Sequence, residues 1–220
     1  RVGGAASRAG VPPLFTSSWG VYGAGHGSSR PIAEDCTGVF GPIDGARWGY
    51  GMAKAIGEQT ALDLHRRTGW PVVVTRLFNT VGPRQVGEYG MVIPRFIQKA
   101  LADEPIEVYG DGRQTRCFVH VRDVAAALPK LLGDTACHGS VYNLGGSDEV
   151  TIERLARRVI ERSGSRSQVV HVPYDQAYQT RFDDLRRRVP DLGRVQEAIG
   201  FAPTASLDEM IDELIASGRG

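Results

Sequence analysis

The feature that most constrains this 220-residue chain is its alternation of short apolar, β-branched runs with stretches of helical periodicity. Such alternation is typical of a largely parallel α/β sheet, because parallel strands need crossovers that helices usually supply. Residues 2–10 are predicted to be the end of a helix, and 24–46, rich in Gly, Pro, Asp and Ser, a loop over one end of the sheet. We expect strands at 13–17, 70–76, 107–109, 141–144 and 168–172, and helices at 47–67, 93–102, 121–132, 152–160, 191–199 and 207–216.

Composition narrows the classes of partner. The formal net charge of +1 gives no reason to expect nucleic-acid or anionic-membrane binding, and no apolar stretch is long enough to span a bilayer. The three cysteines and five histidines show no metal-ligand spacing, so no metal site is predicted. Three widely spaced cysteines also argue against a disulfide framework and favour a reducing cytoplasm.

One helical stretch carries a chemical pattern, Tyr50-x-x-x-Lys54. Residues at i and i+4 share a helix face, so the phenol and the ammonium can converge on one ligand. A free phenol has a pKa of about 10, and a nearby cation favours its ionised form. The pair is therefore suited to removing a proton from an alcohol while hydride leaves the same carbon.

Polar residues also follow two of the predicted strands. Residues 17–23, which include Ser17 and Ser18, are predicted to be the loop after the first strand, and residues 77–85 follow the second. Loops at the C-terminal ends of parallel strands are where α/β sheets bind ligands. Taken alone, the two serines are better explained by ordinary turn chemistry.

Five motifs in register carry a resemblance to a known family: Ser18, Tyr50-x-x-x-Lys54, Arg76-Leu77-Phe78-Asn79, residues 110–116 (GDGRQTR) and residues 188–191 (RVPD). In this order they resemble the extended short-chain dehydrogenase/reductases, and more closely the NAD-dependent epimerase/dehydratase group that acts on nucleotide sugars. The fold implied is a truncated Rossmann-type doubly wound parallel sheet with a small C-terminal α/β substrate-binding part.

The resemblance implies a role for each matching residue. Ser18, Tyr50 and Lys54 would be catalytic, with Tyr50 as the acid/base and Lys54 holding the nicotinamide ribose of NAD. The implied cofactor-binding set is Ser17, Tyr50, Lys54, Leu77 and Phe78. The implied substrate-binding set, for a nucleotide-diphosphate sugar that is expected to be a UDP-sugar, is Ser18, Asn79, Tyr109, Arg116 and Arg188. The family also implies a homodimer formed through the helix that bears Tyr50.

The sequence departs from the family at its beginning. Members start with a strand, Gly-x-x-Gly-x-x-Gly and a helix, and none of these is present. We therefore expect a fragment of a longer protein that binds NAD weakly or not at all by itself. Residues 1–90 are then the C-terminal half of the NAD-binding Rossmann domain. Residues 91–220 are mainly the substrate-binding part, with one or more segments returning to the Rossmann sheet.

The resemblance leaves three functions open. The first is a UDP-glucose or UDP-glucuronate 4-epimerase that acts through a transient 4-keto sugar. It is favoured because Trp19 and Gly20 replace the acidic pair of related dehydratases and the Ser-Glu of related decarboxylases. The second is a UDP-glucuronate decarboxylase or NDP-sugar 4,6-dehydratase, suggested by Arg47-Trp48 before Tyr50. The third is a non-catalytic sugar-nucleotide binder or redox sensor, which would need a broken catalytic set.

Overall fold

The computed structural model describes residues 13–24, 30–41, 48–85, 87, 91–174 and 186–218. The helix end expected at 2–10 and parts of the expected loop at 24–46 lie outside these residues. None of the described helices is long and apolar enough to cross a lipid bilayer.

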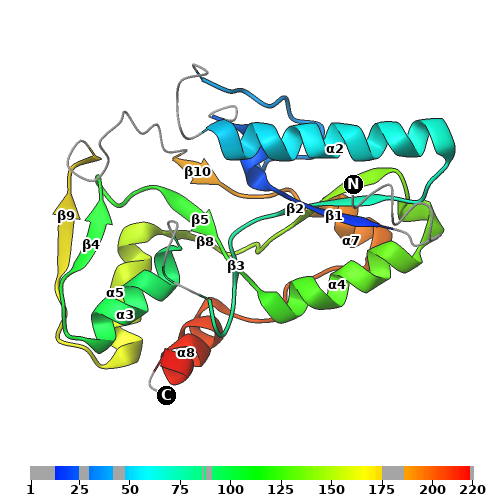
Figure 1. Ribbon diagram of the computed structural model, residues 1–220. Helices are drawn as coiled ribbons and strands as arrows, with labels where there is room; N and C mark the ends of the chain where they lie inside the picture. Colours follow the sequence, from blue (N-terminus) through cyan, green and yellow to red (C-terminus); the bar gives the residue numbers. More distant parts are fainter. Residues whose placement is uncertain are drawn as a thin grey trace.

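A three-stranded parallel sheet with the order β1-β2-β7 organises the upper part of the molecule (Figure 1). Its strands are β1 (Leu14–Ser18), β2 (Val73–Leu77) and β7 (Ser140–Leu144). The register places Ser18 beside Leu77 and Leu77 beside Leu144, so the three strands end together. The sheet edge formed by these three ends is where a ligand of a parallel α/β sheet is expected.

Helices lie on both sides of this sheet. Helix α2 (Trp48–Thr68) runs along one side, and α4 (Val121–Gly133) and α7 (Gly193–Ile199) cover the other (Figure 1). Apolar residues of β2 and β7 form a buried cluster with those of α4 and α7. The expected doubly wound parallel α/β architecture is thereby confirmed.

Two glycines bring α2 unusually close to β1 and to the segment that follows it. A Cβ at Gly57 would come within 2.3 Å of the Phe15 ring, and a Cβ at Gly51 within 2.3 Å of the Gly20 carbonyl oxygen. Contacts below 3 Å are not tolerated by real side chains, so only glycine permits this approach. The close packing holds the first turn of α2, with Tyr50, against the end of β1.

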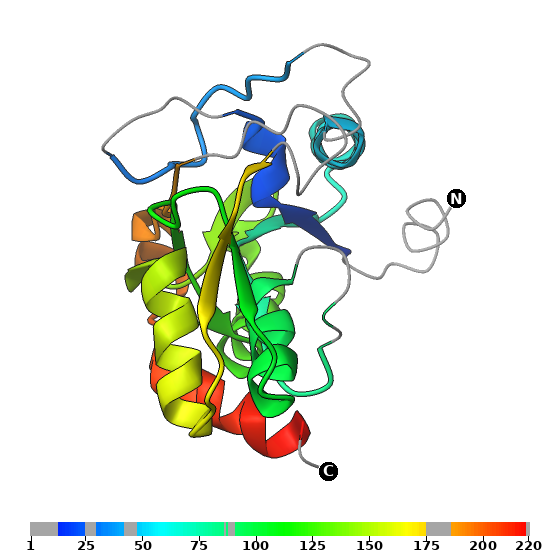
Figure 2. The same cartoon turned by 90° about the vertical axis from the view of Figure 1, so that its left-hand side faces the viewer.

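The remaining elements build a second cluster below the sheet. Strand β4 (Ile106–Tyr109) pairs in parallel with β9 (Val169–Val172), and these strands lie beside α3 (Val92–Leu101) and α5 (Ile152–Ser163) (Figure 2). Helix α8 (Leu207–Gly218) completes the cluster.

The start of α5 shows how the sequence specifies its helix. The Thr151 hydroxyl accepts a hydrogen bond from the Arg154 amide at 3.1 Å, so Thr151 caps the helix N-terminus. Residues 152, 155, 156 and 159 are all buried, as the helical spacing predicts.

Several short elements were not expected from the sequence. The predicted loop at 17–23 contains a 3-10 helix, η1 (Trp19–Tyr22), which the Ser18 hydroxyl caps by accepting from the Gly20 amide at 3.2 Å. The predicted loop at 77–85 contains β3 (Thr80–Val81), which pairs with β6 (Val119–His120). The others are β5 (Thr115–Cys117), β8 (Glu149–Thr151), β10 (Arg187–Arg188) and η2 (Thr135–Cys137).

Candidate active site

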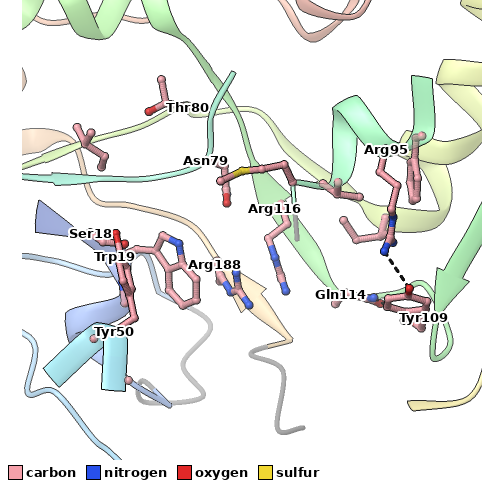
Figure 3. A pocket seen from close by; sticks show the side chains of 18 of the residues that line it. Ser18, Trp19, Tyr50, Asn79, Thr80, Arg95, Tyr109, Gln114, Arg116 and Arg188 are labelled. Atoms are coloured by element: carbon pink, nitrogen blue, oxygen red, sulfur yellow. Dashed lines mark hydrogen bonds between the residues drawn. The ribbon is translucent and has the colours of Figure 1, made fainter. Parts of the chain in front are cut away.

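A cavity of about 750 Å³ opens where β1 and β2 end. Elements of the lower cluster form its opposite wall (Figure 3). Of the predicted site residues, seven line this cavity: Ser18, Tyr50, Leu77, Asn79, Tyr109, Arg116 and Arg188. The other three, Ser17, Lys54 and Phe78, are not among the residues that line it.

Ser18 and Tyr50 meet at one end of the cavity. A Cβ at Gly20 would lie 3.4 Å from the Tyr50 ring and 3.6 Å from the Ser18 hydroxyl oxygen, so both side chains flank that glycine. Tyr50 is 60% exposed, whereas Ser18 is buried. Two hydroxyls from different elements therefore face the same space, one of them accessible to a ligand.

Lys54 lies one turn after Tyr50 on α2. Its ammonium donates a hydrogen bond to the Thr16 carbonyl at 2.8 Å and lies 5.8 Å from the centroid of the Tyr50 ring. The contact with β1 fixes a positive charge next to the phenol. Lys54 does not itself line the cavity, so the proposed convergence with Tyr50 on one ligand stays a prediction.

Three guanidinium groups line the cavity away from the Ser18 end. Arg116 is buried and donates to the Thr115 carbonyl at 2.6 Å, and Arg188 lies with its guanidinium carbon 3.7 Å from the centroid of the Trp19 ring. Arg95 is the third. Glu107 is the one acidic side chain among the described residues that line the cavity. The space is therefore strongly cationic, which suits a phosphorylated ligand.

The end of the cavity opposite Ser18 is formed by Tyr109 and Arg95 (Figure 3). The Arg95 guanidinium donates to the Tyr109 hydroxyl at 2.9 Å and lies 4.6 Å from the centroid of its ring. The Gln114 side chain donates to the Tyr109 carbonyl at 2.9 Å. These contacts hold an aromatic face against the cavity, where it could stack on a flat ring.

The residues expected to contact the cofactor do not all line the cavity. Leu77 lines the cavity, whereas Phe78 is fully buried and packs 6.1 Å from Tyr22, ring centroid to ring centroid. Ser17 is buried, and its hydroxyl makes no hydrogen bond within the described part of the chain. An orphaned hydroxyl beside Ser18 fits a polar group of a bound cofactor.

Asn79 occupies a strained position at the start of β3. Its φ of +29° is rare for a residue other than glycine, and its side chain donates to the Cys117 carbonyl at 2.8 Å. This hydrogen bond joins the loop after β2 to β5 and holds the Asn79 amide at the cavity wall.

The motif residue Arg76 faces away from the cavity. Its guanidinium donates to both Glu58 carboxylate oxygens, at 2.9 and 2.7 Å, and lies 4.7 Å from the Tyr22 ring centroid. Burial opposes ionisation, but the hydrogen bonds to Glu58 raise the pKa of Arg76 above its ordinary value. Burial raises the pKa of the Tyr22 hydroxyl to about 12, and that hydroxyl donates to Asn143 at 2.7 Å. This network ties α2 to the sheet.

The geometry agrees with comparisons to known proteins. The sequence profile of the NAD-dependent epimerase/dehydratase family matches residues 1–145. The chain belongs to this family. NAD is the family's cofactor, and both the predicted family and the predicted cofactor are confirmed at that level.

The relatives perform several reactions. The chain is 36% identical over 203 residues to a UDP-N-acetyl-alpha-D-glucosaminuronate decarboxylase of Bacillus cytotoxicus, covering 92% of this chain and 62% of that protein. It is 34% identical over 216 residues to UDP-glucuronic acid decarboxylase 2 of Arabidopsis thaliana, covering 98% of this chain and 46% of that protein. The chain thus spans about half to three fifths of the length of these relatives.

A similar solved structure is the UDP-glucose 4-epimerase of Thermotoga maritima with UDP-glucose. The identity is 28% and the TM-score 0.82, over 97% of this chain and 65% of that one. Decarboxylases and epimerases therefore both occur among the family members that the chain resembles.

Several cavity residues, among them Trp19, Arg95 and Glu107, have no site role assigned from the sequence. Trp19 was noted only as a departure from relatives, and Arg95 and Glu107 carried no motif. Trp19 meets Arg188, and Arg95 meets Tyr109, only because distant segments of the chain pack together. Only the position of Trp19 directly after Ser18 was a signal that could have been used.

Proposed function

We propose that the full-length protein oxidises the C4 hydroxyl of a UDP-sugar to a ketone with NAD. The observation that carries this proposal is a single cavity with Ser18 and Tyr50 at one end, and Arg116 and Arg188 farther along. A sugar held at the hydroxyl end would place its diphosphate among the guanidinium groups. Tyr109 would then be available to stack on the base.

The chain's own residues have separate tasks in this chemistry. Tyr50 takes the O4 proton, and Ser18 hydrogen-bonds the same hydroxyl to orient it. Lys54, fixed by the Thr16 carbonyl, holds a positive charge 5.8 Å from the centroid of the Tyr50 ring and would bind the nicotinamide ribose. Ser17 and Leu77 would complete the cofactor contacts. Bound NAD would supply the acceptor for the C4 hydride and return a hydride at the end of the cycle.

For the overall reaction we propose decarboxylation of a UDP-uronic acid. Both curated relatives described above are decarboxylases of such substrates. Oxidation at C4 turns the uronate into a β-keto acid, in which the C5–C6 bond breaks and its electron pair moves into the ketone as an enolate. Carbon dioxide leaves, and water supplies the proton that adds to C5. With water as the donor, the step needs no proton-transferring side chain next to Ser18, so Trp19 and Gly20 are compatible with it.

A 4-epimerase is the second candidate, and a specific observation favours it. The two residues after Ser18 carry an indole and a hydrogen, neither of which can transfer a proton to a sugar. An epimerase needs no such group, because hydride leaves and returns at the same carbon. The similar protein of Thermotoga maritima is a UDP-glucose 4-epimerase. A 4,6-dehydratase, which must move two further protons, is the least compatible.

The experiment is incubation of the full-length protein and NAD with UDP-glucuronate, UDP-N-acetylglucosaminuronate or UDP-glucose, followed by NMR. We expect loss of the C6 carboxylate and formation of a UDP-pentose or its 4-keto form. A C4 epimer without release of carbon dioxide would replace decarboxylation by the second candidate. No reaction at C4 with any of the three sugars would contradict the proposed function.

We further propose a homodimer and a cytoplasmic location for the full-length protein. All three cysteines are free thiols, with Cys36 exposed, which suits a reducing compartment. The outer face of α2 exposes Ile56, which could pack against a second copy.

A further inference from the structure

The contact between Trp19 and Arg188 joins two distant parts of the chain. Trp19 begins η1 directly after Ser18, and Arg188 ends the short strand β10. The guanidinium carbon lies 3.7 Å from the centroid of the indole, over the ring face, and both residues line the cavity (Figure 3). This is a short cation–π contact, well inside the range in which such contacts attract.

We propose that Trp19 is a positioning residue that orients Arg188 toward the diphosphate of the substrate. The inference rests on the proposed function, because it takes a UDP-sugar as the ligand of the cavity. It deepens that function by assigning a task to the residue that directly follows Ser18.

The shape of the guanidinium explains why a ring face is an effective support. All of its N–H donors lie in one plane, so stacking occupies the face and directs the edge toward oxygen acceptors. An unsupported arginine would lose rotamer freedom when it bound phosphate. A stacked arginine has already lost part of its rotamer freedom, so binding phosphate costs less conformational entropy.

The other cavity arginines are held in different ways. Arg116 donates to the carbonyl of its own strand, and Arg95 donates to the Tyr109 hydroxyl and lies 4.6 Å from the centroid of that ring. Of the three, Arg188 is the one stacked on the residue next to Ser18. Trp19 therefore links the group that would bind the diphosphate to the hydroxyl that would bind O4, and it sets the distance between them.

The test is a double-mutant cycle on UDP binding to the full-length protein, measured by calorimetry with UDP alone. Trp19→Leu keeps an apolar side chain but removes the π face, whereas Trp19→Phe keeps a π face. We expect Trp19→Leu to raise the Kd for UDP about tenfold, equivalent to about 1.4 kcal/mol, and Trp19→Phe about twofold. In an Arg188→Met background, Trp19→Leu should change the Kd less than twofold.

A second arm leaves Trp19 in place. Arg188→Lys keeps the charge but not the planar group, so it should weaken UDP binding nearly as much as Arg188→Met. Trp70→Phe, which removes an indole outside the cavity, should leave the Kd unchanged.

The outcomes separate the inference from the proposed function. Equal effects of Trp19→Leu in both backgrounds, or full binding by Arg188→Lys, would overturn the role of Trp19 while leaving UDP as the ligand. A wild-type protein that binds no UDP would overturn both.

Discussion

At the scale of single residues, the proposed chemistry depends on the Tyr50 hydroxyl and the Lys54 ammonium. Tyr50→Phe should lower kcat about 10²-fold or more, because it removes the general acid/base. Lys54→Met should also lower kcat, because it removes the charge next to the phenol. It should weaken NAD binding as well, because it removes the proposed contact with the nicotinamide ribose. Steady-state kinetics and calorimetry on the full-length protein provide the measurement. UDP affinity should be unchanged in both variants, and Tyr142→Phe, in the core, serves as a matched control. Near wild-type turnover in Tyr50→Phe would refute the mechanism.

The sequence predicted which residues to examine but not how each is held. Ser18, Tyr50, Asn79, Arg116 and Arg188 stand out because local motifs mark them, and the structure brings all five to one cavity. Local spacing cannot show that the Lys54 ammonium binds the Thr16 carbonyl. It also cannot show that Phe78 is turned into the core, or that Arg188 stacks on a tryptophan 169 positions earlier, because these contacts form only when distant segments pack.

At the scale of elements, long segments were predictable and short ones were not. The helix expected at 47–67 is Trp48–Thr68, and the strand expected at 141–144 is Ser140–Leu144. Over the 21 residues of the helix, the weak preference of each residue adds up to a recognisable signal. Strands such as β3 and β10 have two residues each, and they exist only because a partner strand lies beside them. The antiparallel pairing of β5 with β8 could not be predicted from the sequence either.

Asp123, in the first turn of α4, connects this helix to the segment that precedes α8. Its carboxylate accepts hydrogen bonds from the Thr204 hydroxyl at 2.6 Å and the Thr204 amide at 3.0 Å, before α8 begins. Burial alone would raise the pKa of Asp123, but these bonds outweigh it and hold that pKa below its ordinary value. A depressed carboxyl pKa contributes stability that is present above the unfolded-state pKa and is lost as the pH falls through the folded-state value.

Asp123→Asn should therefore destabilise the protein at neutral pH and not in acid. We expect a loss of about 1 kcal/mol at pH 7, a small value because the site is partly solvated. This corresponds to a decrease of about 2–4 °C in Tm. Thermal melts from pH 7 down to about 2 provide the measurement, with Asp63→Asn on the surface of α2 as the control. A difference from wild type that persisted undiminished in acid would contradict the proposed cause.

At the scale of the whole molecule, the cavity lies where two separately packed clusters meet. Val73, Val124 and Leu144 belong to the cluster of the upper sheet, whereas Phe96 and Leu155 belong to that of α3, α5 and α8. Ser18 and Tyr50 come from the first part, whereas Arg95 and Tyr109 come from the second. A ligand that spans the cavity would therefore contact both, so its binding should depend on how firmly they are held together.

We expect two copies of the full-length protein to form a dimer through the exposed face of α2. Gly49, Ala53, Ile56 and Thr60 recur at helical spacing on that face, and all four are exposed, Ile56 to 69%. Small residues let a second helix approach closely, and an exposed isoleucine among them gains from burial. We expect the full-length protein to sediment as a dimer at micromolar concentration and Ile56→Glu to sediment as a monomer. Val170→Glu, which places the same charge at another exposed aliphatic residue, should remain dimeric. A wild-type protein that sediments only as a monomer would show that this face has another role.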